Sequence, residues 1–175
     1  MALVTRKPID ENATSLQKRP KVGKRKDKRS EFGRLYVIKL VLKDGTEVHK
    51  IGMCNSDRST DRMMEILRSF FMVYRYVPYA ELRRDKKVRI PYIVESYIHR
   101  LLKEYRYKFD KKFNGNSEAF EIDEDSFLEY LDSFRYEEML EGETKMDTDR
   151  YNKIKRAIQL DKDPDTFSED MPIPF

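Results

Sequence analysis

The sequence contains one cysteine, Cys54, and two histidines among its 175 residues. A single cysteine cannot form a disulfide within the chain, and one cysteine with two histidines falls short of the four ligands of a structural zinc site. No apolar run approaches the ~20 residues that cross a membrane, and the first residues lack the apolar core of a signal peptide. There is also no internal repeat. These absences predict a cytoplasmic protein in a reducing compartment, with no membrane segment.

Charged residues, in contrast, are abundant and unevenly distributed. They make up 39% of the chain, with a net charge of +4. Residues 1–34 hold eleven Lys and Arg against four Asp and Glu, residues 35–136 hold nineteen against seventeen, and residues 137–175 hold six against eleven. The three segments therefore carry +7, +2 and −5. Such a gradient is typical of a core flanked by two solvated tails, and the basic front end favours a polyanionic partner.

The same gradient suggests three parts. Residues 1–31 are poor in apolar side chains and rich in basic ones, including Lys24 and Arg25, so we expect a disordered basic arm. The arm would either add phosphate contacts or serve only as a solubilising tail. Residues 32–140 have the pattern of a folded domain, and residues 141–175 are expected to form an acidic C-terminal tail with a short helix.

The pattern of apolar residues predicts an α+β domain. Asp44-Gly45 lies between two β-type runs, which is a strong hairpin signal. Pro78 places the third strand at an edge or a bulge, and Pro91 marks the start of a helix. The expected strands cover 35–42, 46–51, 72–82 and a short stretch at 118–122, and the expected helices cover 61–71, about 91–105, 125–136 and about 150–160. We predict a small, mostly antiparallel sheet of three main strands, the hairpin plus a third strand, flanked by helices. Residues 83–89 would form a loop rich in Lys and Arg.

Several of these segments resemble a known family. Leu35-Tyr36-Val37 and Lys50-Ile51-Gly52 are similar to the paired motifs of the GIY-YIG nuclease superfamily, and Arg62 and Glu95 follow in the family order. The Glu95-x-x-x-His99 spacing and the later Ser117-Glu118-Ala119-Phe120 resemble a mostly phage and bacterial branch. The similarity covers about Arg34 to Ile122 and rests on the joint order of the motifs. The branch resemblance favours a phage-encoded protein that acts in a bacterial host.

The sequence departs from the family pattern at two places. The first Gly-Ile-Tyr motif is reduced to Arg34-Leu35-Tyr36, although the tyrosine is kept. The second tyrosine is replaced by Lys50, as in related branches that include some restriction enzymes. This replacement leaves the route of proton transfer open.

The resemblance implies a Mg²⁺-dependent DNA endonuclease, with Mn²⁺ as an alternative metal. Glu95 would be the metal ligand, and Tyr36 would position or deprotonate the attacking water with the help of Lys50. Arg62 would bind the scissile phosphate through its planar guanidinium, with Arg58 as the fallback. His99 would support the site or act as a general acid, or else form only a surface pair with Glu95 on the same helical face.

The register of the hairpin tests whether Tyr36 and Lys50 share a site. With a two-residue turn they would lie on opposite faces of the sheet, because side chains alternate along a strand. A three-residue loop with Gly45 in the left-handed region pairs Lys50 with Ile38 instead. Lys50 then lies diagonal to Tyr36 on one face, about 7–8 Å away. We predict this bulged hairpin.

The basic residues between the third strand and the Glu95 helix are candidate contacts to the DNA backbone. They are Arg83, Arg84, Lys86, Lys87 and Arg89, and the alternative is that they form only a solvated loop. Glu118 is a candidate second acidic site residue by resemblance.

Two other functions are consistent with the sequence. One is a catalytically silent nucleic-acid-binding module on the same fold, and the other is an interaction protein whose acidic tail binds a basic partner. The oligomeric state stays open, but a site of this kind cuts one strand at a time. A double-strand break would therefore need a dimer or two separate events.

Overall fold

The computed structural model describes residues 31–55, 58–141 and 146–162. Four strands and five helices form the domain, with short 3₁₀ turns at Lys103–Tyr105 and Asn116–Glu118. In chain order they are β1 (Phe32–Val41), β2 (Glu47–Cys54), α1 (Ser59–Tyr74), β3 (Tyr79–Arg89), α2 (Pro91–Leu101), β4 (Ala119–Phe120), α3 (Glu124–Asp132), α4 (Glu137–Glu141) and α5 (Thr148–Asp161). The expected arm, with Lys24 and Arg25, lies outside the described residues except for Glu31.

The sheet is antiparallel, in the order β3-β1-β2-β4. The α+β class is therefore confirmed, with four strands in the sheet. The fourth, β4, is only two residues long and pairs Phe120 with His49 and Ala119 with Lys50. Its place beside β2 brings the 3₁₀ turn at Asn116–Glu118 next to Lys50.

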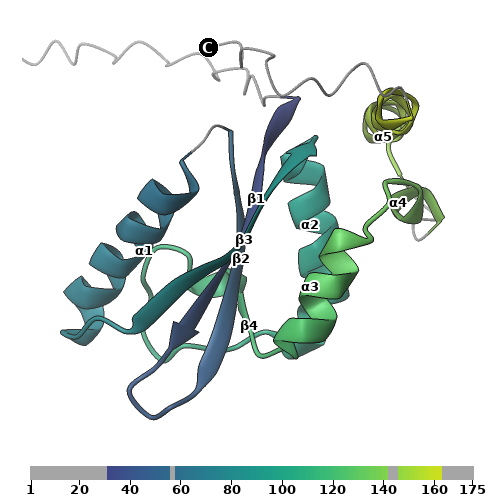
Figure 1. Cartoon of the computed structure of the whole chain (residues 1–175). Helices are drawn as coiled ribbons and strands as arrows, with labels where there is room; N and C mark the ends of the chain where they lie inside the picture. The colour runs from purple at the N-terminus through teal and green to yellow at the C-terminus, as the bar shows by residue number, and fades with distance from the viewer. Residues whose placement is uncertain (1–30, 56–57, 142–145, 163–175) are drawn as a thin grey trace, which may run out of the picture.

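Helices cover both faces of the sheet. In Figure 1, α1 lies on one side and α2 and α3 lie on the other. The alternation of β1 explains this arrangement, because Tyr36 and Ile38 pack with the α1 residues Ile66 and Phe70. Leu35 and Val37 point the other way into a second core, together with apolar residues of α2, α3, α4 and α5. A central strand buried on both faces reads as a nearly continuous apolar run.

The prediction for the third strand was wrong at both ends. Residues 72–74 belong to α1, because Val73 and Tyr74 continue the apolar helical face of Ile66 and Phe70 at helical spacing. The helix ends at Arg75, which adopts a left-handed conformation with φ 61°. The strand then runs from Tyr79 to Arg89, so residues 83–89, which were predicted to form a loop, are part of β3. An edge strand tolerates such charged side chains because one edge and much of its surface face water.

The hairpin prediction is confirmed. Ile38 pairs with Lys50, and Tyr36 pairs with Gly52. The turn is closed by a bond from Gly45 N–H to the Leu42 carbonyl of 2.9 Å, and Gly45 has φ 87°. Tyr36, Lys50 and Gly52 therefore lie on the same face of the sheet.

The last helices extend the core past α3. In Figure 1, α4 and α5 lie beyond α3, at the far side of the domain from α1. Ile154 and Ala157 of α5 are buried and pack in the same core as Leu131 and Met139. Among the described residues, no helix is both long and apolar enough to span a membrane.

Candidate active site

Tyr36 is held against the backbone of β2. Its side chain is 1% exposed, and the pairing with Gly52 leaves the phenol ring directly over that glycine. A β-carbon at Gly52 would lie 2.4 Å from the phenolic oxygen. Burial raises the pKa of Tyr36, although a hydrogen bond from Arg62 opposes this shift. The group is therefore a neutral phenol near pH 7.

Lys50 is enclosed beside Tyr36 by a turn that leads into β4. It is 1% exposed, and its ammonium group forms an ion pair with Glu118. A β-carbon at Gly115 would lie 2.6 Å from Lys50 Cε, so this turn packs directly on the lysine. Burial lowers the pKa of Lys50 to about 7, with Glu95 acting in the opposite direction and Arg62 adding to the shift. Burial outweighs the opposing effect of Glu95.

Arg62 reaches the site from the first turns of α1. It hydrogen-bonds to Tyr36 and forms an ion pair with Glu65. Burial lowers the pKa of Arg62, but these two partners outweigh it and leave the pKa raised. The guanidinium therefore stays charged, and its side chain is 34% exposed.

The start of α1 is fixed by residues that the sequence analysis did not single out. Ser59 is buried and donates a hydrogen bond of 2.8 Å to Asp85 on β3. Asp85 lies opposite Tyr36 in the sheet and is 3.6 Å from Arg34. The Ser59–Asp85 bond thus sets the position of the helix that carries Arg62. No sequence signal indicates it, since the two residues are 26 positions apart.

Glu95 and His99 hold α2 against the edge of β2 beyond its pairing with β4. Glu95 accepts a hydrogen bond from the backbone N–H of Met53, and His99 Nε2 donates to the Ile51 carbonyl over 2.7 Å. Residues four apart on a helix lie about 6 Å apart, close to the spacing of alternate strand residues. The Glu-x-x-x-His spacing therefore matches two outward-facing backbone groups of one strand. Burial raises the pKa of Glu95 and lowers that of His99.

Four of the predicted catalytic residues converge. Tyr36 and Arg62 are hydrogen-bonded, and both Lys50 and Arg62 act electrostatically on Glu95. They come from β1, α1, β2 and α2, in that order. His99 contacts the backbone behind this group and is not a surface partner of Glu95. Arg58, the fallback for Arg62, is 58% exposed and pairs with Asp61 and Glu65 at the start of α1.

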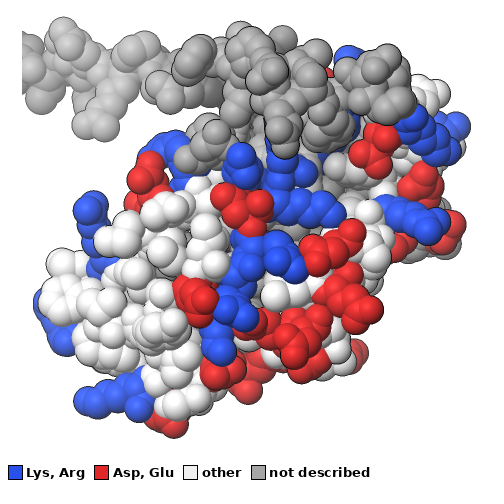
Figure 2. All heavy atoms as spheres, in the orientation of Figure 1, with Lys and Arg blue, Asp and Glu red and all other residues white. Residues whose placement is uncertain are grey.

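Three of the β3 residues that were predicted to contact DNA instead contact residues of α3. Arg83 occupies a bulge in the pairing with β1, and its guanidinium donates to Glu124 over 2.6 Å. The same carboxylate lies 2.7 Å from the ring of His49. Arg84 reaches Asp132 over 2.7 Å, and Lys86 donates to the Leu131 carbonyl over 2.6 Å. Figure 2 shows the resulting mixture of basic and acidic side chains over β3 and α3. Lys87 lies on the opposite face of β3, in register with Arg34.

Three carboxylates lie beside the group of Tyr36, Lys50 and Arg62, namely Glu65, Glu95 and Glu118. No group of three or more His, Cys, Asp or Glu residues placed to hold a metal occurs within the described ranges. Glu118 is paired with Lys50 and Glu65 with Arg62, which leaves Glu95 as the candidate ligand. This set suits a hard cation that keeps several waters, and it does not suit a closed structural zinc site.

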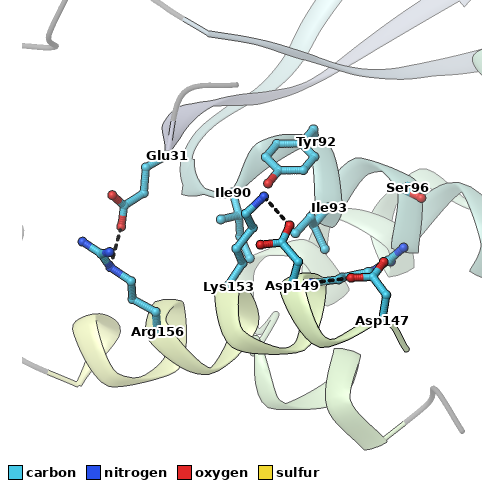
Figure 3. Close-up of a pocket in the computed structure, with 10 residues that line it drawn as sticks. Glu31, Ile90, Tyr92, Ile93, Ser96, Asp147, Asp149, Lys153 and Arg156 are labelled. Atoms are coloured by element: carbon cyan, nitrogen blue, oxygen red, sulfur yellow. Dashed lines mark hydrogen bonds and ion pairs between the residues drawn. The ribbon is translucent and has the colours of Figure 1, made fainter. Parts of the chain in front are cut away.

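A separate cavity lies between α5, Glu31 and the start of α2. It has a volume of about 620 Å³. Figure 3 shows that its charged side chains pair with one another: Lys153 with Asp149 at 2.8 Å, and Arg156 with Glu31 at 3.6 Å. None of the residues that line it belongs to the group around Tyr36.

Comparison with known proteins agrees with this geometry at the level of the family. No curated protein and no solved structure matches the chain. The T5orf172 domain matches residues 33–135, which contain β1 except for its first residue, β2 to β4, α1 to α3 and all of the residues around Tyr36. Since this match covers more than half of the sequence, the chain belongs to the T5orf172 domain family, a phage-associated, nuclease-like domain related to GIY-YIG and HNH-type endonucleases.

Proposed function

We propose that this protein is a Mg²⁺-dependent DNA endonuclease of the GIY-YIG type. The observation that carries the proposal is the convergence of a phenol, an amine, a guanidinium and the Glu95 carboxylate from four separate elements. Phosphodiester hydrolysis needs an oriented water, a proton acceptor and cationic groups near the phosphate. Each of these needs has a candidate residue here.

Glu95 is the proposed ligand of the metal. Mg²⁺ is commonly bound through one or two carboxylates together with substrate phosphates and several waters, so one carboxylate is a sufficient protein donor. The cation would supply charge stabilisation at the phosphate. The bond from Met53 N–H orients the Glu95 carboxylate, and Lys50 and Arg62 favour its ionised form.

Lys50 is the proposed proton acceptor. With a pKa of about 7, a substantial share of this side chain is an uncharged amine at neutral pH. Tyr36 cannot play this part alone, because its raised pKa keeps the phenol protonated. We assign Tyr36 to orienting the water, and Lys50 to taking its proton directly or through the phenol. The lysine in place of the second tyrosine is then a working part of the site.

Arg62 is the proposed phosphate ligand. Among Tyr36, Lys50 and Arg62, it has the most exposed side chain, and its raised pKa keeps it charged. A planar guanidinium matches two phosphate oxygens at once. Binding a phosphate would require Arg62 to give up part of its contact with Glu65.

One observation favours the alternative of a silent DNA-binding module. Tyr36 and Lys50 are each 1% exposed, and Lys50 lies beneath the turn that contains Gly115 and Glu118. A scissile phosphate could reach Lys50 only if this turn shifts. A chain that binds DNA with the turn closed would not cut.

Nicking of supercoiled plasmid tests the two functions. The full chain, Glu95→Gln and Glu129→Gln would be incubated with plasmid and Mg²⁺, with EDTA as a further control. Glu129 is an exposed carboxylate on α3, so it matches the charge change away from the site. We expect nicking by the parent chain and by Glu129→Gln, and none by Glu95→Gln or with EDTA. Nicking that survives Glu95→Gln would remove the assigned ligand, and DNA binding without nicking over several divalent metals would establish the silent module.

A further inference from the structure

The segment Arg106–Phe113, here called the basic loop, separates its aromatic and charged residues by face. The four cationic side chains are all exposed, whereas the three aromatic ones are buried or half-buried. The cations are Arg106, Lys108, Lys111 and Lys112, and the aromatics are Tyr107, Phe109 and Phe113. Asp110 is the single acidic residue, so the loop carries four positive charges against one negative.

The aromatic residues anchor the loop on α1. Phe113 packs edge-on against Phe70 with ring centroids 5.1 Å apart, and Phe109 packs against Phe113 at 4.8 Å. The Tyr74 hydroxyl donates to Asp110 over 2.5 Å and accepts from the Lys111 backbone over 3.1 Å. Such contacts fix the backbone of the loop and hold its cations on the outer side.

The loop leads directly into the candidate active site. Two residues after Phe113 comes Gly115, which packs on Lys50, and Glu118 pairs with the same lysine. At its other end, Tyr107 N–H bonds to the Ala119 carbonyl of β4 over 2.9 Å. The exposed cations therefore lie on the segment that leads directly into the turn enclosing Lys50.

The charge of the loop is not neutralised by neighbouring acids. Lys108 and Lys112 form no ion pair with any residue in the described part of the chain. In β3, by contrast, Arg83 and Arg84 are paired with Glu124 and Asp132. A phosphate that binds the arginines must compete with a carboxylate, and one that binds the lysines displaces only water and counterions.

We propose that the basic loop is the main backbone-binding surface of the domain, contacting phosphates of the DNA next to the scissile bond without reading bases. This role rests on the proposed function for its substrate, DNA, but not on the assignment of any catalytic residue. Lys108 and Lys112 would each neutralise a phosphate. The paired cations of β3 would contribute little.

Salt-dependent DNA binding tests the proposal. Binding of full-length Glu95→Gln to two duplexes of unrelated sequence would be measured between 50 and 200 mM salt, roughly the range over which phosphate contacts dominate. Two variants would be made in the Glu95→Gln protein. The loop variant is Lys108→Ala/Lys112→Ala, and the matched control is Lys155→Ala/Lys162→Ala, on and just after α5. The control lysines are exposed and lie outside the matched domain.

We expect the loop variant to lower the slope of log K against log salt by about 2, roughly 1 for each lost phosphate contact, and to weaken both duplexes by the same factor. The control should retain the parent slope. An unchanged slope in the loop variant, an equal fall in the control, or no binding of either duplex by the parent would overturn the proposal. If the slope falls as expected but the wild-type chain never nicks plasmid, the loop assignment stands and the proposed catalysis fails.

Discussion

Gly52 lies directly beneath the phenol of Tyr36, so close that a β-carbon on Gly52 would be 2.5 Å from the ring carbon Cζ. The two residues are paired across β1 and β2, and no side chain other than hydrogen fits between them. The glycine of Lys50-Ile51-Gly52 is therefore required by the ring that it faces. This contact fixes where the hydroxyl of Tyr36 can lie.

Gly52→Ala is expected to displace the phenol and abolish most of the activity. Overpacking a buried contact costs about 1–3 kcal/mol, and an error of about 1 Å in a catalytic group costs roughly 100-fold in rate. Plasmid nicking and denaturant unfolding measure the two effects. Gly45→Ala is the control, since φ 87° makes it unfavourable while its surroundings are open. It should lower stability by about 1 kcal/mol with the nicking rate retained; full activity in Gly52→Ala would contradict the close contact.

Tyr36→Phe should lower the nicking rate by about 10²- to 10⁴-fold, the usual contribution of a group that handles the proton of the water. The ring that packs over Gly52 is kept, so the melting temperature should change by no more than a few degrees. Single-turnover cleavage together with thermal unfolding separates these outcomes. A variant that cuts at the parent rate would show that the phenolic hydroxyl takes no part.

His99→Ala should act through α2. The substitution leaves the Ile51 carbonyl without its donor, which costs about 1–3 kcal/mol, and it loosens the helix that carries Glu95. We expect lower stability, weaker dependence on Mg²⁺ and partial loss of rate, with His99→Gln restoring part of all three because an amide can donate. Complete loss of cleavage at unchanged stability, without rescue by Gln, would instead assign His99 as a general acid.

The cleavage rate is expected to rise with pH through about 7, because the pKa of Lys50 is about 7 and the amine must be uncharged to accept a proton. Lys50→Arg places a permanently charged group at the same position and should abolish cleavage across this range. A pH–rate profile under single-turnover conditions measures this rise of the cleavage rate with pH. A profile that is flat from pH 6 to about 8 would exclude Lys50 as the proton acceptor.

Lys50→Met should stabilise the fold most at neutral and lower pH. The pKa of Lys50 falls from its usual 10.5 to about 7 on folding, so the unfolded chain binds more protons between these values. The stability of the parent therefore rises with pH across this window, whereas Lys50→Met lacks this contribution. Urea unfolding at several pH values should show that the difference in free energy of unfolding between Lys50→Met and the parent shrinks as pH rises toward 10.5. An advantage that grows with pH would reverse the sign of the shift.

The pattern of the sequence was sufficient for the fold class and for the hairpin. Asp44-Gly45 between two apolar runs predicted the turn, and the parity of a strand then placed Tyr36 and Lys50 on one face. The order of Tyr36, Arg62 and Glu95 was enough to indicate the group that the fold brings together. It could not locate β3, because Val73 and Tyr74 suit a strand and a helix equally well when read without their neighbours.

Local pattern determined which residues could form the site, because alternation and helical spacing are properties of short segments. Tertiary structure decided the surroundings of each of them. Burial under the Gly115 turn lowers the pKa of Lys50, and the Ser59–Asp85 bond positions α1. Helix α3 pairs Arg83 and Arg84, whereas Lys108 and Lys112 form no ion pair with a described residue. Each of these depends on residues far apart in the chain. Desolvation and charge pairing are set by that packing, and no local sequence pattern encodes them.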